Sequence, residues 1–103
     1  MNRKEGLRIA LEFKNLLLKR GYPIRRMVLF GSVAKGTDRP ESDIDIAVIT
    51  EPFGVSRLRE GGDILLASKD IDLRIETITL HQEDFDRPFF TLGKELERTG
   101  VEV

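Results

Sequence analysis

Two aspartates alternate with isoleucines at residues 43–46, directly ahead of Ala47 and Val48. Successive side chains of a β-strand point to opposite faces of the sheet, so the pattern predicts a strand over residues 43–50 with Asp43 and Asp45 on one face. Two carboxylates about 7 Å apart along that backbone can converge on hard divalent cations. The segment therefore predicts a carboxylate pair carried by a largely apolar strand.

A glycine-serine turn lies ten residues upstream of this strand. The apolar run 26–30 predicts a buried strand that ends at Gly31, and Ser32 is expected to cap a short helix that reaches Lys35. Backbone N–H groups and a hydroxyl at such a turn suit a phosphate. The turn is not a P-loop, because Gly36 is followed by Thr37 rather than lysine. Alone, such a turn is more often structural, but together with the aspartates it predicts a nucleoside triphosphate site.

The residue types present restrict the metals that this site could bind. The chain has no cysteine and only one histidine, His81, which excludes thiolate sites and histidine-based zinc centres. Any metal must therefore rest on carboxylates, which suit Mg²⁺ or Mn²⁺.

Composition excludes several classes of protein. The 103 residues predict one domain, residues 1–103. A net charge of -1 gives no drive toward nucleic acid, and no apolar run approaches a membrane span. Because the N-terminus lacks an apolar signal core, we expect a cytoplasmic protein.

The periodicities predict an α/β (α+β) fold: a small mixed β-sheet with helices packed on one face. Residues 70–78 alternate polar and apolar residues and predict a third strand, with Ile71, Leu73 and Ile75 facing the core. Helices are expected at residues 3–20, at 56–69 with a break at Gly61-Gly62, and over part of 83–98, where the aromatic pair 89–90 packs inward. Residues 101–103 predict a short edge strand, and residues 36–42 a polar loop.

A third carboxylate is expected from the strand at residues 70–78, because two-metal chemistry needs ligands from more than one backbone segment. Asp72 is the first candidate, since it lies in the middle of the predicted strand, and Asp70 and Glu76 are the alternatives. Lys35 and Arg74 are equally well explained as phosphate contacts or as surface cations in ion pairs.

The spacing Gly31-Ser32, ten residues, Asp43-x-Asp45 resembles the signature of the DNA polymerase beta-like nucleotidyltransferase superfamily. Residues 71–74 resemble that family's third metal-binding strand, and the short length is similar to the minimal nucleotidyltransferases (MNT) of prokaryotes. The resemblance implies the nucleotidyltransferase fold. It also implies that Gly31 and Ser32 hold phosphates and that Asp43, Asp45 and Asp72 bind two Mg²⁺ ions. Lys35 stands where many members carry arginine, so it keeps the charge but loses the bidentate fork.

For minimal members the resemblance also implies a partner, a helical HEPN-type protein in a toxin–antitoxin pair. The nucleotidyltransferase would be the antitoxin, and it would transfer a nucleotide, AMP from ATP, to a hydroxyl of the toxin. The alternative is a nucleotide-binding module that neutralises its partner by occlusion without transfer. The sequence leaves open the nucleobase, the acceptor atom and whether the chain forms homo- or hetero-oligomers.

Overall fold

The computed structural model describes residues 2–36 and 43–103. Six of the seven residues expected to form the polar loop, 37–42, lie outside these residues. The predicted mixture of helices and a small sheet is confirmed. In chain order the described elements are α1 (Arg3–Lys19), β1 (Ile24–Phe30), α2 (Gly31–Lys35), β2 (Ile44–Thr50), α3 (Arg57–Ser68), β3 (Ile75–His81), the 3₁₀ helix η1 (Gln82–Asp86), α4 (Thr91–Thr99) and β4 (Val101–Glu102).

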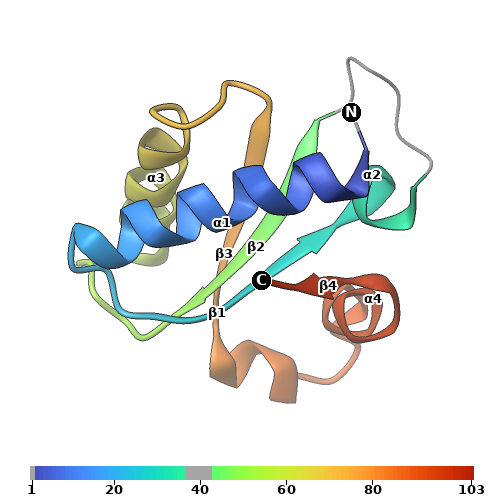
Figure 1. Cartoon of the computed structure of the whole chain (residues 1–103). Helices are drawn as coiled ribbons and strands as arrows, with labels where there is room; N and C mark the ends of the chain where they lie inside the picture. Colours follow the sequence, from blue (N-terminus) through green and yellow to red (C-terminus); the bar gives the residue numbers. More distant parts are fainter. Residues whose placement is uncertain (1, 37–42) are drawn as a thin grey trace.

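The four strands form one mixed sheet in the order β3-β2-β1-β4. β2 pairs antiparallel with β1 and parallel with β3, while the short β4 pairs antiparallel with β1. The strand that carries Asp45 is therefore central, and residues of both neighbouring strands lie beside it (Figure 1).

The larger part of the core lies between α1, α2, α3 and one face of the sheet. α1 crosses in front of the strands in Figure 1, and its first turn is capped by Asn2, whose side chain accepts the Glu5 N–H at 2.8 Å. The apolar side of α1 packs on alternate residues of β1 and β2, as the periodicities predict. The buried residues of this part of the core include Phe13, Leu17, Met27, Leu29, Ile44, Ile46, Val48, Ile64 and Ile75.

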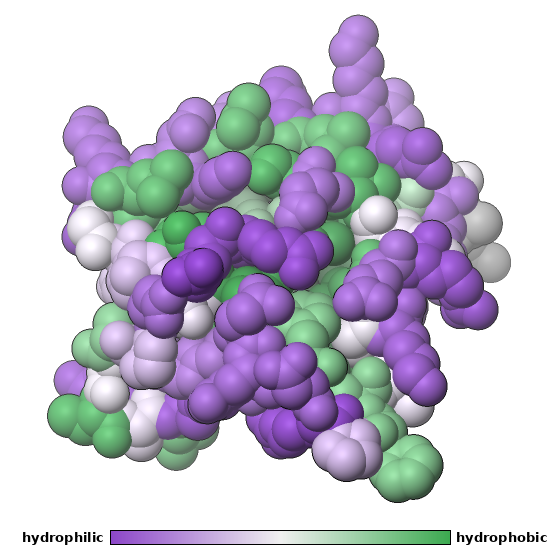
Figure 2. Space-filling model, turned by 90° about the horizontal axis from the view of Figure 1, so that it is seen from below, coloured by the Kyte–Doolittle hydropathy of each residue, from purple (hydrophilic) through white to green (hydrophobic). Residues whose placement is uncertain are grey.

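The opposite face of the sheet is also covered, so the prediction of helices on one face only was wrong in this detail. Leu96 of α4 packs against Val28, Ala47 and Ile49, and Phe85 of η1 packs beside them. Consecutive buried residues in β2 are typical of a strand enclosed on both faces. Seen from below, hydrophilic residues cover much of the surface, with hydrophobic ones in separate patches (Figure 2).

The third strand begins five residues later than predicted, at Ile75. The N–H groups of Ile71 and Asp72 both bond to the carbonyl of Ser68 and so continue the end of α3 as turns. The side chain of Asp72 accepts the backbone N–H of Arg74 at 2.9 Å, which closes a further local turn. Leu73, expected in the core, is consequently 78% exposed.

α3 continues without the expected break at Gly61-Gly62. Ser56 caps its start by accepting the Arg59 N–H at 3.1 Å. Each glycine still costs the helix about 1 kcal/mol relative to alanine. Near the C-terminus Phe89 is also unlike its prediction, because it is almost fully exposed and has a φ of 63°. No helix in the described part of the chain is long and apolar enough to cross a membrane.

Candidate active site

The backbone of Gly31 lies against the side chain of Asp45. β1 and β2 pair with Phe30 opposite Asp45, so the turn that leaves β1 runs directly over the carboxylate. Gly31 has a φ of 72°, and a Cβ at this position would lie 2.2 Å from Oδ2 of Asp45. Both the backbone conformation and the contact exclude a side chain. The glycine therefore allows a carboxylate to lie against the backbone at the start of α2.

Glu76 lies beside Asp45 on the neighbouring strand. The parallel register of β2 and β3 pairs these two residues, so their side chains share one face of the sheet. Burial raises the pKa of the Asp45 carboxyl, and the charges of Asp43, Glu76 and Glu95 raise it further. The acidic groups that act on Asp45 thus come from the residue before β2, from β3 and from α4. Like charges in one place favour a bound cation.

Asp72 lies in the turn before β3 and is paired with Arg74. The guanidinium donates to both carboxylate oxygens, at 3.0 and 2.8 Å. These bonds are the main reason that the pKa of Asp72 lies below its ordinary value, although burial acts against them. Asp72 is therefore held by a cation within its own turn, whereas Glu76 occupies the position next to Asp45.

The other predicted phosphate contacts lie on α2. Ser32 does not take the predicted N-cap position, because α2 begins at Gly31 and its N-cap is Phe30. Lys35 lies 3.6 Å from a carboxylate oxygen of Glu95, and Arg74 pairs with Asp72. Lys35 and Arg74 thus both form ion pairs, which was one of the two interpretations of these residues. A phosphate-binding role for either residue stays a prediction. The Arg3 side chain, which donates to the Ala34 carbonyl at 2.8 Å, ties α1 to α2.

Sequence reasoning did not find Glu95, because nothing local indicates that α4 returns to the Asp45 side of the sheet. It also missed a buried pair outside the site, Glu60 and His81, whose Oε1 and Nε2 atoms are 2.7 Å apart. His81 is the buried last residue of the edge strand β3 and occupies the cap position of η1.

The acidic groups suit a divalent cation by their chemistry. All the donors are carboxylate oxygens, which hard cations prefer, and Gly31 leaves room for the Asp45 carboxylate where a side chain would collide with it. The described side chains do not by themselves form a group of three that could hold a metal ion. The expectation that a divalent cation binds here therefore rests on the type of donor atom and on the repulsion between the carboxylates, rather than on a preformed set of metal ligands.

A glycine turn set against the Asp45 carboxylate of β2, with Glu76 beside it on β3, suits enzymes that transfer phosphorus-containing groups. The chain belongs to the nucleotidyltransferase domain family, whose sequence model matches residues 11–98. The family resemblance seen in the sequence is thereby confirmed, and the protein is a nucleotidyltransferase by family.

Solved structures share this fold. One is a protein from Sulfolobus solfataricus described as a candidate nucleotidyltransferase, with a TM-score of 0.68 and 20% identity over 97% of this chain and 80% of its own. Another is a toxin–antitoxin with AMP-PNP, with a TM-score of 0.61 and 20% identity over 90% of this chain and 70% of its own. A third is a mutant of the toxin–antitoxin MntA-HpeT in which two aspartates, separated by one residue, are glutamates. Its TM-score is 0.55, at 20% identity over 99% of this chain and 72% of its own. No curated protein sequence matches the chain.

Proposed function

We propose that this protein is a Mg²⁺-dependent enzyme that transfers AMP from ATP to a hydroxyl of a partner protein. We further propose that the partner is a HEPN-type helical toxin and that the transfer neutralises it in the cytoplasm. The observation that carries the proposal is the contact of Gly31 with Asp45, beside Glu76. Membership of the nucleotidyltransferase family supports the reaction type. The fold shared with two toxin–antitoxin structures, one of them with AMP-PNP, supports the partner and the nucleotide.

In the proposed reaction an acceptor hydroxyl oxygen attacks the α-phosphorus of ATP. The new bond joins that oxygen to the phosphorus, the bond to the bridging oxygen breaks, and pyrophosphate leaves with the electron pair. The hydroxyl proton is released to water. Asp43, Asp45 and Glu76 would hold the divalent cations. These cations, when bound, lower the pKa of the attacking hydroxyl and offset charge on the leaving oxygens.

The chain's own residues mainly position the reactants. The N–H groups at Gly31 and Ser32 would orient the phosphate chain, with Lys35 as the nearest cation on α2. Of the three candidates for the third carboxylate, we favour Glu76 over Asp72 and Asp70. Glu76 lies beside Asp45 in the sheet. A guanidinium already occupies both oxygens of Asp72, and Asp70 pairs with Arg20 at 2.8 Å.

Changing Asp43 and Asp45 together to asparagine is expected to lower AMP transfer by at least about 10³-fold, because charge stabilisation at the phosphorus is lost. The measurement is transfer of label from α-labelled ATP, with Mg²⁺, to the product of the neighbouring reading frame, tested as the proposed partner. A folded double variant that still labels the partner would contradict the proposed chemistry. If the variant does not label the partner but still neutralises it fully, the protein acts by occlusion rather than by transfer.

Glu76→Gln and Asp72→Asn are expected to show which of these two residues supplies the third carboxylate. Glu76→Gln should lower transfer by about 100-fold or more and reduce the rise in Tm that Mg²⁺ gives the wild type. Asp72→Asn should lower Tm slightly, through its ion pair with Arg74, and leave most of the transfer. The opposite ranking in the transfer assay would assign the third carboxylate to Asp72.

A further inference from the structure

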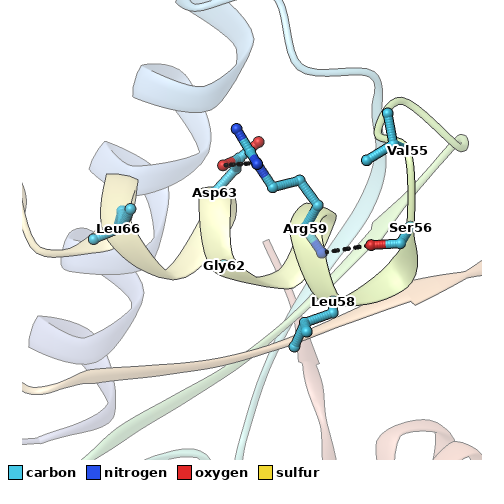
Figure 3. Close-up of a pocket in the computed structure, with 7 residues that line it drawn as sticks. All are labelled: Val55, Ser56, Leu58, Arg59, Gly62, Asp63 and Leu66. Atoms are coloured by element: carbon cyan, nitrogen blue, oxygen red, sulfur yellow. Dashed lines mark hydrogen bonds and ion pairs between the residues drawn. The ribbon is translucent and has the colours of Figure 1, made fainter.

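The outward side of α3 is apolar, although it faces solvent. Leu58 is 87% exposed and Leu66 is 72% exposed, and Val55, just ahead of the helix, is 93% exposed. Leu65 is also exposed, beside them. Val55, Leu58 and Leu66 line one shallow pocket, which Figure 3 shows along the outer side of the helix. Leu58 and Leu65 line a second hollow, beside the edge strand β3. Exposed apolar groups gathered in this way mark an interaction surface.

Gly62 lies at the centre of this surface. At 100° per residue, the exposed residues Leu58, Leu65 and Leu66 lie on either side of Gly62. Ile64 and Ala67 point the other way, into the core. A Cβ at Gly61 or Gly62 would meet nothing within 4 Å. No contact within the described chain therefore requires a glycine here, and both have helical rather than positive φ. A glycine does, however, let another helix approach the backbone closely.

The charges on one flank of this surface are of both signs. Arg59 and Asp63 lie one turn apart, with Nε and Oδ1 at 3.7 Å, and both point to the same side of the helix (Figure 3). Consider two copies of α3 that are antiparallel, cross at Gly62 and are related by a two-fold axis. The axis keeps this flank of both copies on the same side of the pair. It then brings Arg59 of each copy alongside Asp63 of the other, and Leu58 alongside Leu66. The surface is thus self-complementary, as a two-fold interface must be.

We propose that α3 is a homodimer interface in which two copies of this chain cross, antiparallel, at Gly62. The occupant is a second copy because both the apolar residues and the charges match their own two-fold image. α3 packs on one face of the sheet. Asp45 lies on the other face, because Ala47 and Ile49, which point to the same face of β2 as Asp45, pack against α4. The dimer therefore leaves the acidic face open to a substrate or partner. This inference does not rest on the proposed reaction.

The two glycines supply a matched pair of variants. Gly62→Ala should raise the dimer Kd by about tenfold or more, because its methyl group lies at the crossing point. Gly61→Ala should leave the Kd within about threefold, because residue 61 lies to one side. Both should raise the helix content and, at a concentration where the chain is monomeric, raise Tm by roughly 4 °C. The Kd is measured by sedimentation equilibrium on the chain alone.

A charge exchange tests the partner of each residue. Arg59→Asp and Asp63→Arg should each raise the Kd about fivefold, because like charges then meet across the axis. The double variant should restore the wild-type Kd. Circular dichroism shows whether each variant keeps its helices.

Three results would overturn the proposal. The first is a wild-type chain that remains monomeric at several hundred micromolar, even if the same α3 substitutions weaken binding to a helical partner. The second is an equal effect of the two glycine variants on the Kd. The third is a double charge variant that behaves no better than the single ones.

Discussion

Replacing Gly31 by alanine is expected to reduce nucleotidyl transfer by on the order of 100-fold and to destabilise the fold. The φ of 72° costs an alanine about 1–2 kcal/mol. The new Cβ would also lie 2.2 Å from Oδ2 of Asp45, so the carboxylate must move. A displacement of about 1 Å is enough to cost 10²-fold in a positioned reaction. The measurements are urea unfolding for stability and initial rates at saturating ATP for transfer.

Gly21→Ala is the matched control for the Gly31 variant. Gly21 has a φ of 86°, but a Cβ there would meet nothing within 4 Å. The control should therefore lose a similar free energy of unfolding and keep its transfer rate. If Gly31→Ala retained the wild-type rate, the position of Asp45 against this turn would not matter to catalysis. If both variants lost activity equally, the effect would come from stability alone.

The order of the elements could be predicted because it depends on local patterns. Alternation predicted the strand that carries Asp45 to within a residue, and helical spacing predicted α1 to within a residue. Residues 70–74 show where alternation misleads. They carry the same polar–apolar pattern as a strand, but the Asp72 side chain bonds the Arg74 N–H and stabilises a turn instead.

The site could be predicted only in part, because its assembly depends on register. A strand that begins at Ile75 rather than at residue 70 makes Glu76, not Asp72, the neighbour of Asp45. Glu95 is close enough to Asp45 to raise its pKa, yet only the return of α4 to that face brings it there. Such contacts between distant parts of the chain leave no mark in any short window of sequence.

The buried carboxylate of Glu60 is expected to be among the strongest single contributors to stability. It is 2% exposed. Its Oε2 accepts the N–H groups of Phe53 and Gly54 at 2.6 and 3.1 Å, and its Oε1 lies 2.7 Å from Nε2 of His81. One side chain thus joins the segment after β2, the first turn of α3 and the end of β3.

Glu60→Ala is therefore expected to lower the free energy of unfolding by about 3–5 kcal/mol, because it leaves two backbone donors and an imidazole buried without their partner. Urea unfolding at pH 7 measures the loss. At a concentration where the chain is monomeric, Arg59→Ala, at an exposed neighbouring position in the same helix, should change the free energy by no more than about 0.5 kcal/mol. A Glu60→Ala loss below about 1 kcal/mol would mean that water replaces the carboxylate at little cost.

The same carboxylate gives the stability a defined dependence on pH. Burial alone would raise the pKa of Glu60, but the N–H groups of Phe53 and Gly54 and the His81 ring outweigh it. The pKa therefore lies below its ordinary value of 4.5. Between the lowered and the ordinary pKa the unfolded chain binds more protons than the folded one, so stability falls as the pH falls. The contribution of Glu60 is then complete above about pH 5 and is lost on acidification.

Glu60→Gln isolates this effect, because it keeps the size of the side chain and one acceptor oxygen but does not titrate. The difference in Tm between the wild type and this variant should be largest at pH 6–7 and should shrink as the pH is lowered below 4.5. Asp84, whose pKa is lowered chiefly by the Arg57 guanidinium, adds an acid-sensitive contribution common to both proteins, so it cancels in the difference. A difference that stays constant, or grows, between pH 6 and pH 3 would mean that Glu60 is not held as a carboxylate in the folded chain.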